Sequence, residues 1–569
     1  MKKELFITLS LTLFFITTYV QSQTLDWAKS FGGDGIDRPI SIVNDDLGNV
    51  YTLGGFSDTV DFDPNSGTSN VTSNGSTDVY IQKLDENGNF IWIKSLGGTG
   101  QDYGYSIEID NSNNIYVVGA FANTVDFDLG AGIDNVSSNG NLDAFLLKLN
   151  SDGDVLLKRT FGGIGKDELN SIELNSSNEI YLAGQFQKTV DFDPGVNETN
   201  INAIASNGTD LFILKLDTNA DFLWVKNIGG NGNDPMLQPG ITGAKEVVVD
   251  AGGNIYLTGF YTRNSDFDPG VGVSELISNG PYHMFVLKLD TNGNYVWAKS
   301  VGGIDETWGN SITIDNSGNV YSTGYFDETA DFDPGVGVNN LISSGNRDVY
   351  VQKLDSNGDF IWAKSFGSTN QDIGTSIITD SSGNVYISGY FSDTVDFDPG
   401  NSVVNLSSVG SDAIFILRLD TNGNFSWVQS LGSNSFVPTI TTDTLGGFYI
   451  TGSFINTMTF DFGNGSNNFI SNGYLDTFIL KFSINSLSND NNEMLRTISY
   501  FPNPTNEELT IISRDNFKIS VYDINGKIVK RVTKNSREFS FSLKNLSPGL
   551  YLLKGENSTS SFSKRIIVN

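Results

Sequence analysis

The sequence predicts an all-β protein: a seven-bladed β-propeller of four-stranded blades, each about 65 residues long, followed by a small C-terminal β-sandwich. Three observations predict this architecture. A four-residue phrase recurs through most of the chain, a tryptophan phrase recurs in phase with it, and each interval holds four apolar stretches of strand length. The 62 glycines and 39 phenylalanines among 569 residues agree with short strands joined by tight turns.

The first repeated phrase is Asp-Phe-Asp-Pro. It begins at Asp61, Asp191, Asp266, Asp331 and Asp396, with a variant at Asp126, where Leu129 replaces proline, and a degenerate copy around Phe460-Asp461. With Thr459 as the last aligned position, the successive spacings are 65, 65, 75, 65, 65 and 63 residues. This regularity indicates seven structural repeats.

A tryptophan phrase such as Trp-Ala-Lys-Ser-Phe-Gly-Gly keeps the same period. It begins at Trp27, Trp92, Trp224, Trp297, Trp362 and Trp427, and Leu157 stands in the remaining copy. We expect these tryptophans to pack between blades, because they fall in the outer strand; stacking on sugars is the alternative.

Each repeat holds four predicted strands, for example over residues 106–109, 115–121, 144–149 and 155–160. A β-solenoid is the main structural alternative, but its rungs are shorter. The first tryptophan phrase, at residues 25–33, has no strand before it, and the last apolar strand, at 477–482, has no tryptophan phrase after it. We therefore expect the N-terminal strand to complete the final blade of a propeller spanning residues 24–482.

The N-terminus has the pattern of a signal peptide. Lys2 and Lys3 precede an apolar run over residues 5–20, and the small Ser22 stands before Gln23. We expect residues 1–22 to be removed on export, because the run is shorter than a typical membrane span. A retained membrane anchor is the alternative; after cleavage, no remaining segment of the sequence is apolar enough to span a membrane.

The charge balance argues against a nucleic-acid partner. The chain has 34 basic and 66 acidic residues, a net charge of −32, whereas nucleic-acid binding draws most of its affinity from cationic contacts. Cations or neutral glycans suit this charge better. The absence of cysteine excludes disulfides, thiolate nucleophiles and Cys-ligated zinc.

The repeats resemble the bacterial β-propeller repeats called SBBP. The shared pattern includes Gly97-Gly98, Asp102-Tyr103-Gly104, Gly383-Asn384-Val385-Tyr386 after Asp380, and the strand from Asp348 to Asp355. The resemblance covers residues 25–482 and implies a propeller fold. It implies nothing about the ligand, because the family is defined by its scaffold.

After residue 482 the repeats stop. Residues 483–493 are a polar stretch typical of a linker. Residues 494–569 carry 12 basic and 6 acidic residues, against 22 and 60 in the rest of the chain. This change in the sign of the charge indicates a separate C-terminal domain.

Three blocks of the C-terminal segment resemble the type A sorting domain of the type IX secretion system. They are Tyr500-Phe501-Pro502-Asn503-Pro504, residues 521–527 with Gly526 and Lys527, and residues 546–551 with Gly549 and Tyr551. The resemblance implies that the type IX machinery carries the protein from the periplasm across the outer membrane, and that it is then secreted or attached to the cell surface. An ordinary ligand-binding sandwich is the alternative.

Paired aspartates of the first phrase are candidate calcium ligands. Close carboxylates repel each other unless something neutralises them, and hard oxygen ligands suit calcium. The alternative is that they cap turns through backbone N–H groups. The pairs are Asp61 and Asp63, Asp191 and Asp193, Asp266 and Asp268, Asp331 and Asp333, and Asp396 and Asp398, and we expect Asp37, Asp102, Asp167 and Asp372 to share their face.

The largest departure from the repeat lies between Trp224 and Asp266, which are 42 residues apart where the equivalent residues elsewhere are 34 apart. The additional residues lie near Pro235-Met236-Leu237-Gln238-Pro239. We predict that this apolar insertion forms part of a binding surface.

The sequence offers little catalytic apparatus. His283 is the only histidine, so a His-based metal cluster cannot form, and no Gly-x-Ser-x-Gly motif occurs. We therefore expect a non-catalytic exported module that binds a glycan or a protein, as an adhesin does. A secreted carbohydrate-active enzyme that uses paired carboxylates and a structural surface-layer component are the alternatives.

Overall fold

The protein is described by a computed structural model in which every regular element is a β-strand. The described residues are 22–204, 208–230, 240–432, 435–443, 447–461, 466–485, 499–501, 508–512, 516–523, 527–534, 536, 538–557 and 561–568. Residues Gln23–Ser483 form one compact unit, the repeat region, and the described residues from 499 onward belong to a second, the C-terminal region. Across these ranges, no helix is long and apolar enough to span a membrane.

Several sequence predictions fall outside the described residues. They concern residues 1–21 of the expected signal peptide, residues 486–493 of the expected linker, the insertion at Pro235 to Pro239, and four residues of the sorting motif, Pro502, Asn503, Pro504 and Gly526.

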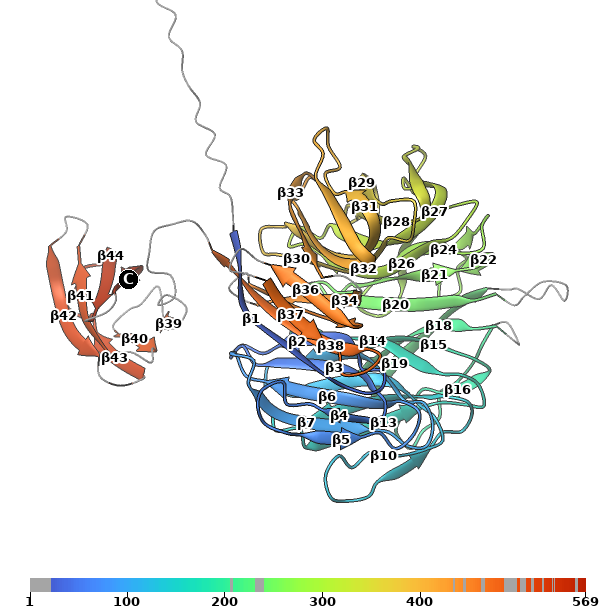
Figure 1. The fold of residues 1–569 in the computed structure, drawn as a ribbon, viewed down its shortest axis with the longest axis horizontal. Coiled ribbons are helices and arrows are strands. Elements are labelled where there is room, and N and C mark those ends of the chain that lie inside the picture. The colour runs from blue at the N-terminus through green and yellow to red at the C-terminus, as the bar shows by residue number, and fades with distance from the viewer. Residues whose placement is uncertain are drawn as a thin grey trace, which may run out of the picture. The chain divides into compact units, whose positions relative to one another are not determined.

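Four-stranded antiparallel sheets repeat along the repeat region, and seven of them occur within the described residues (Figure 1). In chain order, sheet 1 comprises β2 (Arg38–Asn44), β3 (Val50–Phe56), β6 (Asp78–Leu84) and β7 (Phe90–Leu96); sheet 2 comprises β8 (Tyr103–Ile109), β9 (Ile115–Phe121), β12 (Asp143–Leu149) and β13 (Val155–Phe161); sheet 3 comprises β14 (Glu168–Leu174), β15 (Ile180–Phe186), β18 (Asp210–Leu216) and β19 (Phe222–Gly230). Sheet 4 comprises β20 (Thr242–Val249), β21 (Ile255–Tyr261), β24 (His283–Leu289) and β25 (Tyr295–Gly303); sheet 5 comprises β26 (Thr307–Ile314), β27 (Val320–Asp331), β28 (Asn340–Leu354) and β29 (Phe360–Phe366). Sheet 6 comprises β30 (Ile373–Thr379), β31 (Val385–Asp396), β32 (Asn405–Leu419) and β33 (Phe425–Leu431); sheet 7 comprises β34 (Ser435–Thr442), β35 (Phe448–Phe454), β38 (Asp476–Asn485) and β1 (Ser22–Gly33).

The strands form where the sequence predicts them, because the apolar runs are covered on both faces. Every residue of β9 is buried, as expected for a strand between two neighbouring sheets. The turns between strands use aspartate and glycine: Asp85 accepts backbone N–H bonds from Asn87 and Asn89 at 2.9 and 2.8 Å, and Gly88 has a φ of 75°.

A short hairpin after the second strand of each sheet was not predicted. In sheet 1 it pairs β4 (Thr59–Asp61) with β5 (Asn70–Thr72), and in sheets 5 and 6 it extends the longer strands. The other copies are β10 (Thr124–Asp126) with β11 (Asn135–Ser137), β16 (Thr189–Asp191) with β17 (Asn200–Asn202), β22 (Asn264–Asp266) with β23 (Glu275–Ile277), and β36 (Thr457–Asp461) with β37 (Ser466–Ile470).

The hairpin explains why Asp-Phe-Asp and Gly-Gly recur together. Gly32 and Gly33 of β1 pair with Asp61 and Val60, so the glycines at the end of one sheet's fourth strand bond to the hairpin of the next sheet. The backbones approach so closely that a Cβ on Gly33 would lie 2.2 Å from the carbonyl oxygen of Thr59. Both phrases therefore join neighbouring sheets.

The hydrophobic core lies between the sheets. One cluster combines Leu53 and Ile81 of sheet 1 with Ile107, Val117 and Phe145 of sheet 2. The first strands also meet in succession, since β2 contacts β8, β8 contacts β14, and the series continues through β20, β26, β30 and β34.

The first and last sheets are in contact. Strand β34 contacts β2, and the N-terminal strand β1 is the fourth strand of sheet 7, beside β38, as the sequence predicts (Figure 1). Bonds across this junction include Ser483 Oγ to Asp26 Oδ1 at 2.7 Å and the Thr439 hydroxyl to the Ile40 carbonyl at 2.9 Å.

The C-terminal region contains two antiparallel sheets that share one hydrophobic cluster, which includes Leu509, Phe541, Ile519 and Leu553. One sheet comprises β39 (Ser499–Phe501), β40 (Glu508–Ile512) and β43 (Glu538–Ser542); the other comprises β42 (Ile528–Lys534), β41 (Phe517–Tyr522), β44 (Gly549–Glu556) and β45 (Ser561–Val568).

Candidate functional site

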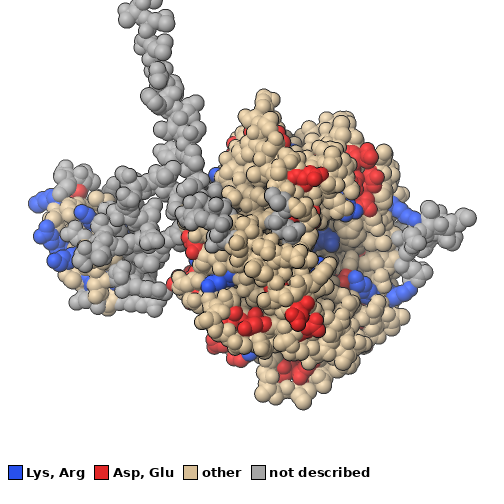
Figure 2. All heavy atoms as spheres, viewed as in Figure 1, with Lys and Arg blue, Asp and Glu red and all other residues tan. Residues whose placement is uncertain are grey.

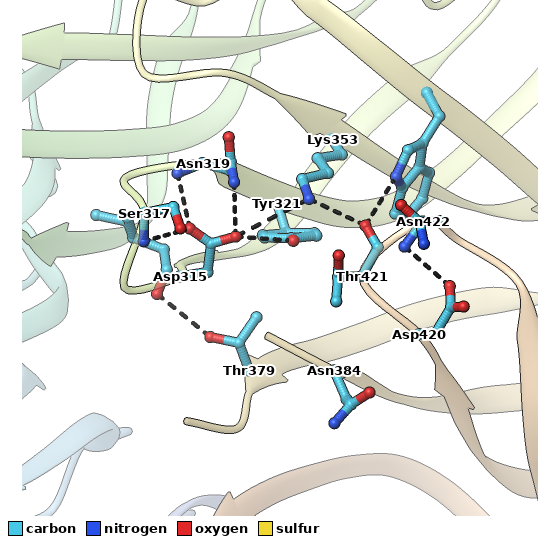
Figure 3. Close-up of polar contacts among 12 residues, drawn as sticks. Asp315, Ser317, Asn319, Tyr321, Lys353, Thr379, Asn384, Asp420, Thr421 and Asn422 are labelled. Atoms are coloured by element: carbon cyan, nitrogen blue, oxygen red, sulfur yellow. Dashed lines mark hydrogen bonds and ion pairs between the residues drawn. The ribbon is translucent and has the colours of Figure 1, made fainter. Parts of the chain in front are cut away.

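A polar clamp recurs between neighbouring sheets and accounts for most of the repeated tryptophans, lysines and tyrosines (Figure 3). In sheet 5, Lys353 Nζ and Trp362 Nε1 both donate to the carbonyl oxygen of Thr421 in the next sheet, at 3.0 and 3.3 Å. Lys353 also lies 4.8 Å from the ring centroid of Tyr321, whose hydroxyl donates to Asp315 at 3.0 Å. The clamp is a joint between sheets.

The same clamp spans the junction of the first and last sheets. Trp27 Nε1 and Lys481 Nζ both donate to the Glu86 carbonyl, at 3.0 and 3.2 Å. Lys83 with Trp92, and Lys288 with Trp297, make equivalent pairs of bonds to Ser151 and Ser356. The prediction that these tryptophans pack between repeats is confirmed.

The Asp-Phe-Asp-Pro aspartates bond within their own loops. Asp61 Oδ1 accepts N–H bonds from Asp63 and Ser69 at 3.1 and 2.7 Å, and Asp63 Oδ1 accepts one from Asn65 at 2.9 Å. Equivalent bonds are made by Asp191 and Asp193, Asp266 and Asp268, Asp331 and Asp333, and Asp396 and Asp398.

These contacts match the turn-capping alternative. Within the described ranges, no three His, Cys, Asp or Glu side chains are grouped so that they could hold a metal ion. Calcium at the paired aspartates stays a prediction.

The connection aspartates are buried between sheets. Asp102 accepts N–H bonds from Gly98 and Ala122 at 2.8 and 3.0 Å, and burial raises its pKa to about 6. It follows Gln101, which bridges to Thr77, and Asp78 is its acidic neighbour on the preceding sheet. Equivalent acidic neighbours are Asp37 with Asp476, Asp167 with Asp143, and Asp372 with Asp348.

The only histidine takes the position of one of these aspartates. Asp78 packs against the backbone of Gly97, where a Cβ would lie 2.2 Å from Asp78 Cγ. His283 packs in the same way against the equivalent Gly302, where a Cβ would lie 2.4 Å from the His283 ring. His283 is 5% exposed and its Nε2 lies 3.0 Å from the Gly303 carbonyl oxygen. His283 is therefore a buried, packed histidine.

A second group of residues departs from the repeat and gathers where sheets 4 and 5 meet. Of the seven tryptophans of the chain, Trp308 on β26 is the one that lies outside the repeated phrase. Its ring centroid lies 4.0 Å from Phe260, 5.1 Å from Tyr282 and 6.0 Å from Tyr325. We call these four residues the aromatic cluster.

Two cations lie against the aromatic cluster. Lys245 Nζ lies 5.6 Å from the centroid of Trp308 and 5.8 Å from that of Phe260. The Arg347 guanidinium lies 4.5 Å from the Tyr325 centroid and forms an ion pair with Glu306 at 3.0 Å. Such distances are those of cation–π contacts.

The group continues across sheets 2 and 3. Glu168 on β14 accepts from the Tyr105 hydroxyl and from Lys166, both at 2.9 Å, and from Gln185 at 2.5 Å. Tyr105 stacks on Tyr103 with centroids 5.9 Å apart. Glu168 also attracts Lys245 electrostatically, which links this arm to the aromatic cluster.

Three glutamates form a further departure on the first strands of sheets 2 to 4. Burial raises the pKa values of Glu108 and Glu246 to about 7 and that of Glu173 well above its usual range, and their mutual repulsion adds to the shift of Glu108 and Glu173. Glu246 accepts the Ile312 N–H at 2.6 Å.

These departures are not predicted from the sequence, because the predictions rest on what the repeats share. The signal was a tryptophan out of phase at Trp308, together with aromatic or charged residues at positions that are small or polar elsewhere. The aromatic cluster uses sheet 4, the sheet that the insertion at residues 231–239 precedes in the chain.

In the C-terminal region, two of the predicted motif residues make local bonds. The Lys527 N–H donates to Asp523 at 2.9 Å and the Tyr551 hydroxyl to the Ser547 carbonyl at 2.7 Å, while Gly549 is the first residue of β44. On the viewed face, Lys and Arg atoms gather on this region, whereas Asp and Glu atoms are spread over the repeat region (Figure 2).

Two parts of this chain match protein families. Residues 499–569 match the family described as the secretion system C-terminal sorting domain, and residues 296–325 match the SBBP β-propeller repeat. The chain carries an SBBP repeat and a type IX sorting domain. The sorting domain marks an SBBP-repeat protein that is secreted or held at the cell surface, and it implies handling by the type IX machinery.

The relatives are distant. The uncharacterized WD repeat-containing protein L264 of Acanthamoeba polyphaga mimivirus is 22% identical over 72% of this chain and 34% of its own length, and the regulatory protein FlaEY of Caulobacter vibrioides is 25% identical over 42% of this chain and 23% of its own. The chain thus spans about a third or less of these relatives. Among solved structures, the extracellular domain of BT4673 from B. thetaiotaomicron aligns over 93% of this chain and 92% of its own, with 12% identity and a TM-score of 0.17.

Proposed function

We propose that the seven sheets are the blades of a closed seven-bladed β-propeller, followed by a small β-sandwich. The support is the cyclic series of contacts from β2 through β34 and back to β2, with β1 as the last strand of sheet 7. A closed ring leaves no first or last blade with an uncovered face, which removes the edge that an open array would expose.

We propose that the protein is a non-catalytic glycan-binding module, secreted or displayed at the cell surface. The single observation that carries this is the aromatic cluster, because Trp308, Phe260, Tyr282 and Tyr325 lie together only by departing from the repeat. Tyr103 of sheet 2 and Tyr390 of sheet 6 take the places of Trp308 and Tyr325, but their paired partners are Ala120 and Ile373. A ring at both paired positions, as in Trp308 and Tyr325, therefore calls for an explanation beyond the scaffold. Aromatic rings beside hydrogen-bonding charged groups suit sugars, which have apolar faces and polar edges.

The test is a glycan array probed with the secreted protein and with Trp308→Ala. We expect Trp308→Ala to weaken binding at least tenfold, since one aromatic contact contributes about 1 kcal/mol or more beyond area burial. Tyr474→Ala is the matched control, because Tyr474 is 61% exposed and lies outside the cluster. Equal binding by wild type and Trp308→Ala would refute this site.

A carbohydrate-active enzyme is the second candidate, favoured by the half-buried glutamates Glu108, Glu173 and Glu246. Raised pKa values near 7 are what a general acid needs. We expect no turnover, because Glu246 already accepts a backbone N–H bond in the joint between sheets 4 and 5. Analysis of the products formed from every bound glycan tests for enzymatic activity. Hydrolysis by the wild type that is lost in Glu108→Gln would establish that the protein is an enzyme.

A further inference from the structure

The first strand of most sheets has a bulge at the same position, and the residue at the bulge usually bonds to the next sheet. The register shifts at Asn170, Asn310 and Thr375 in sheets 3, 5 and 6. Asn170 and Asn310 donate to the carbonyls of Ala244 and Gly374 at 2.8 and 2.9 Å, and Thr375 donates to that of Pro438. The bulge residue is thus normally a joint between sheets.

Lys245 occupies this position in sheet 4 and does not make the joint. The register shifts there between Ala244 and Glu246. Within the described ranges its ammonium group has no hydrogen bond and no carboxylate within ion-pair distance; its contacts are the rings of Phe260 and Trp308. The side chain is exposed.

The carboxylate that attracts Lys245 is already bonded to other groups. Glu168 attracts Lys245 electrostatically, but its oxygens accept from Lys166, Tyr105 and Gln185. Arg347, the other cation at the cluster, is paired with Glu306 and Asp327. Lys245 is therefore the cation of this site whose donors are free for a ligand.

The surroundings of Lys245 penalise its charge. Although the residue as a whole is exposed, desolvation of its ammonium group lowers the pKa of Lys245, and Lys166 repels it. A cation in such a place gains most from an anion that replaces lost solvation, because a charge-assisted hydrogen bond is about twice as strong as a neutral one.

We propose that the aromatic cluster binds a glycan that carries a carboxylate, as a uronic acid residue does, with the carboxylate on Lys245 and the sugar ring on Trp308 and Tyr282, which are half-buried, while the buried Phe260 and Tyr325 support them. This inference rests on the proposed glycan-binding function and specifies its ligand. One carboxylate in an otherwise neutral chain fits better than a polyanion, because the protein's net charge of −32 repels a long run of negative charge.

The experiment compares acid and ester forms of the same sugar. Hyaluronan disaccharide and aldotetraouronic acid, each of which carries one carboxylate, are titrated by calorimetry into the secreted protein, Lys245→Met and Lys364→Met, and so are their methyl esters. Lys364, on the fourth strand of sheet 5, is a control cation with no hydrogen bond or ion pair among the described residues. We expect wild type and Lys364→Met to bind at least one acid about tenfold or more tightly than its ester, and Lys245→Met to bind both forms like the ester.

The outcomes separate this inference from the proposed function. Equal binding of acid and ester by wild type, or binding only of neutral glycans on the array, overturns the carboxylate inference and leaves glycan binding standing. Loss of the ester as well in Lys245→Met also overturns it, because Lys245 would then support the fold. Full binding of both forms by Trp308→Ala overturns the site itself.

Discussion

At the scale of single residues, repetition separates structural side chains from the others. Lys353 is 5% exposed, yet it is a lysine, and burying an ammonium group is costly unless it is bonded. The carbonyl of Thr421 and the face of Tyr321 supply those bonds, and the same arrangement recurs at Lys83, Lys288 and Lys481. Burial of a charge in this protein therefore marks a joint.

The first prediction concerns this clamp. Lys353→Met should lower the free energy of unfolding by about 1–3 kcal/mol, because it removes a hydrogen bond from a charged donor and a cation–π contact. Denaturant melts of the two proteins measure the difference. Lys364→Met should change stability by less than about 0.5 kcal/mol, as surface substitutions do, and an equally large loss in that control would contradict the assignment.

How far the sequence predicts residue roles depends on whether a residue follows the repeat. Trp27 and Trp362 are predicted as packing residues because their period is regular. Tyr105 and Lys245 take the same repeat position with different side chains, and Trp308 takes another position. They are not predicted as a group, because they share no motif and meet only through the folding of sheets 2 to 5. Alignment of the repeats against one another exposes such departures, but not which of them come into contact.

At the scale of elements, alternation and turns predict the four strands of each sheet to within a few residues. The residues predicted as strands at 106–109, 115–121, 144–149 and 155–160 lie within β8, β9, β12 and β13. The short hairpins were missed because their strands are mostly three residues long and half-exposed, too short for a period to be read. Backbone hydrogen bonds to the glycine pair of the preceding sheet stabilise these hairpins.

The second prediction concerns β1. Deleting residues 24–33 should lower the melting temperature by several degrees and broaden the transition, because sheet 7 would lose its fourth strand and β38 would become an edge. Differential scanning calorimetry measures both effects. Trp27→Ala keeps β1 but removes the bond to Glu86 and the packing of the ring beside Tyr449, and it should keep a single sharp transition at a lower temperature. A deletion variant that melts like the wild type would show that β1 is dispensable.

At the scale of the whole molecule, charge sets the response to pH. The buried carboxyls between sheets have raised pKa values: burial raises those of Asp37, Asp167 and Asp372 to about 7. Below about pH 4 these groups are protonated in both folded and unfolded chains. As pH rises towards 7, the unfolded chain releases these protons and the folded protein retains them, so stability is lost.

The third prediction follows from this loss of stability with rising pH. The midpoint of urea unfolding should fall as pH is raised from 5 to 8, and Asp372→Asn should flatten the fall. Asp359→Asn, at an exposed aspartate, should leave the slope unchanged. Below pH 4 a second loss of stability is expected, from Asp110 and Asp315. Burial alone would raise their pKa values, but hydrogen bonds from Asn114 and Asn319 lower them, so protonating these groups destabilises the fold. A midpoint that rises steadily from pH 5 to 8 would contradict the burial of these carboxyls.

The position of β1 in sheet 7 affects the order in which the repeat region can fold. Asp26 and Ser483 bond although 457 residues separate them along the chain. Only Gly32 and Gly33 of β1 pair with an early strand, β4, so the rest of this strand has no partner until the last repeat exists, and the region cannot complete its fold from either end alone. Contacts at such separation are slow to form. Sheets 1 to 6 can assemble while synthesis continues, but sheet 7 cannot form until the chain reaches residue 485. A truncated product would therefore keep most of β1 unpaired and accessible to proteases and to other chains.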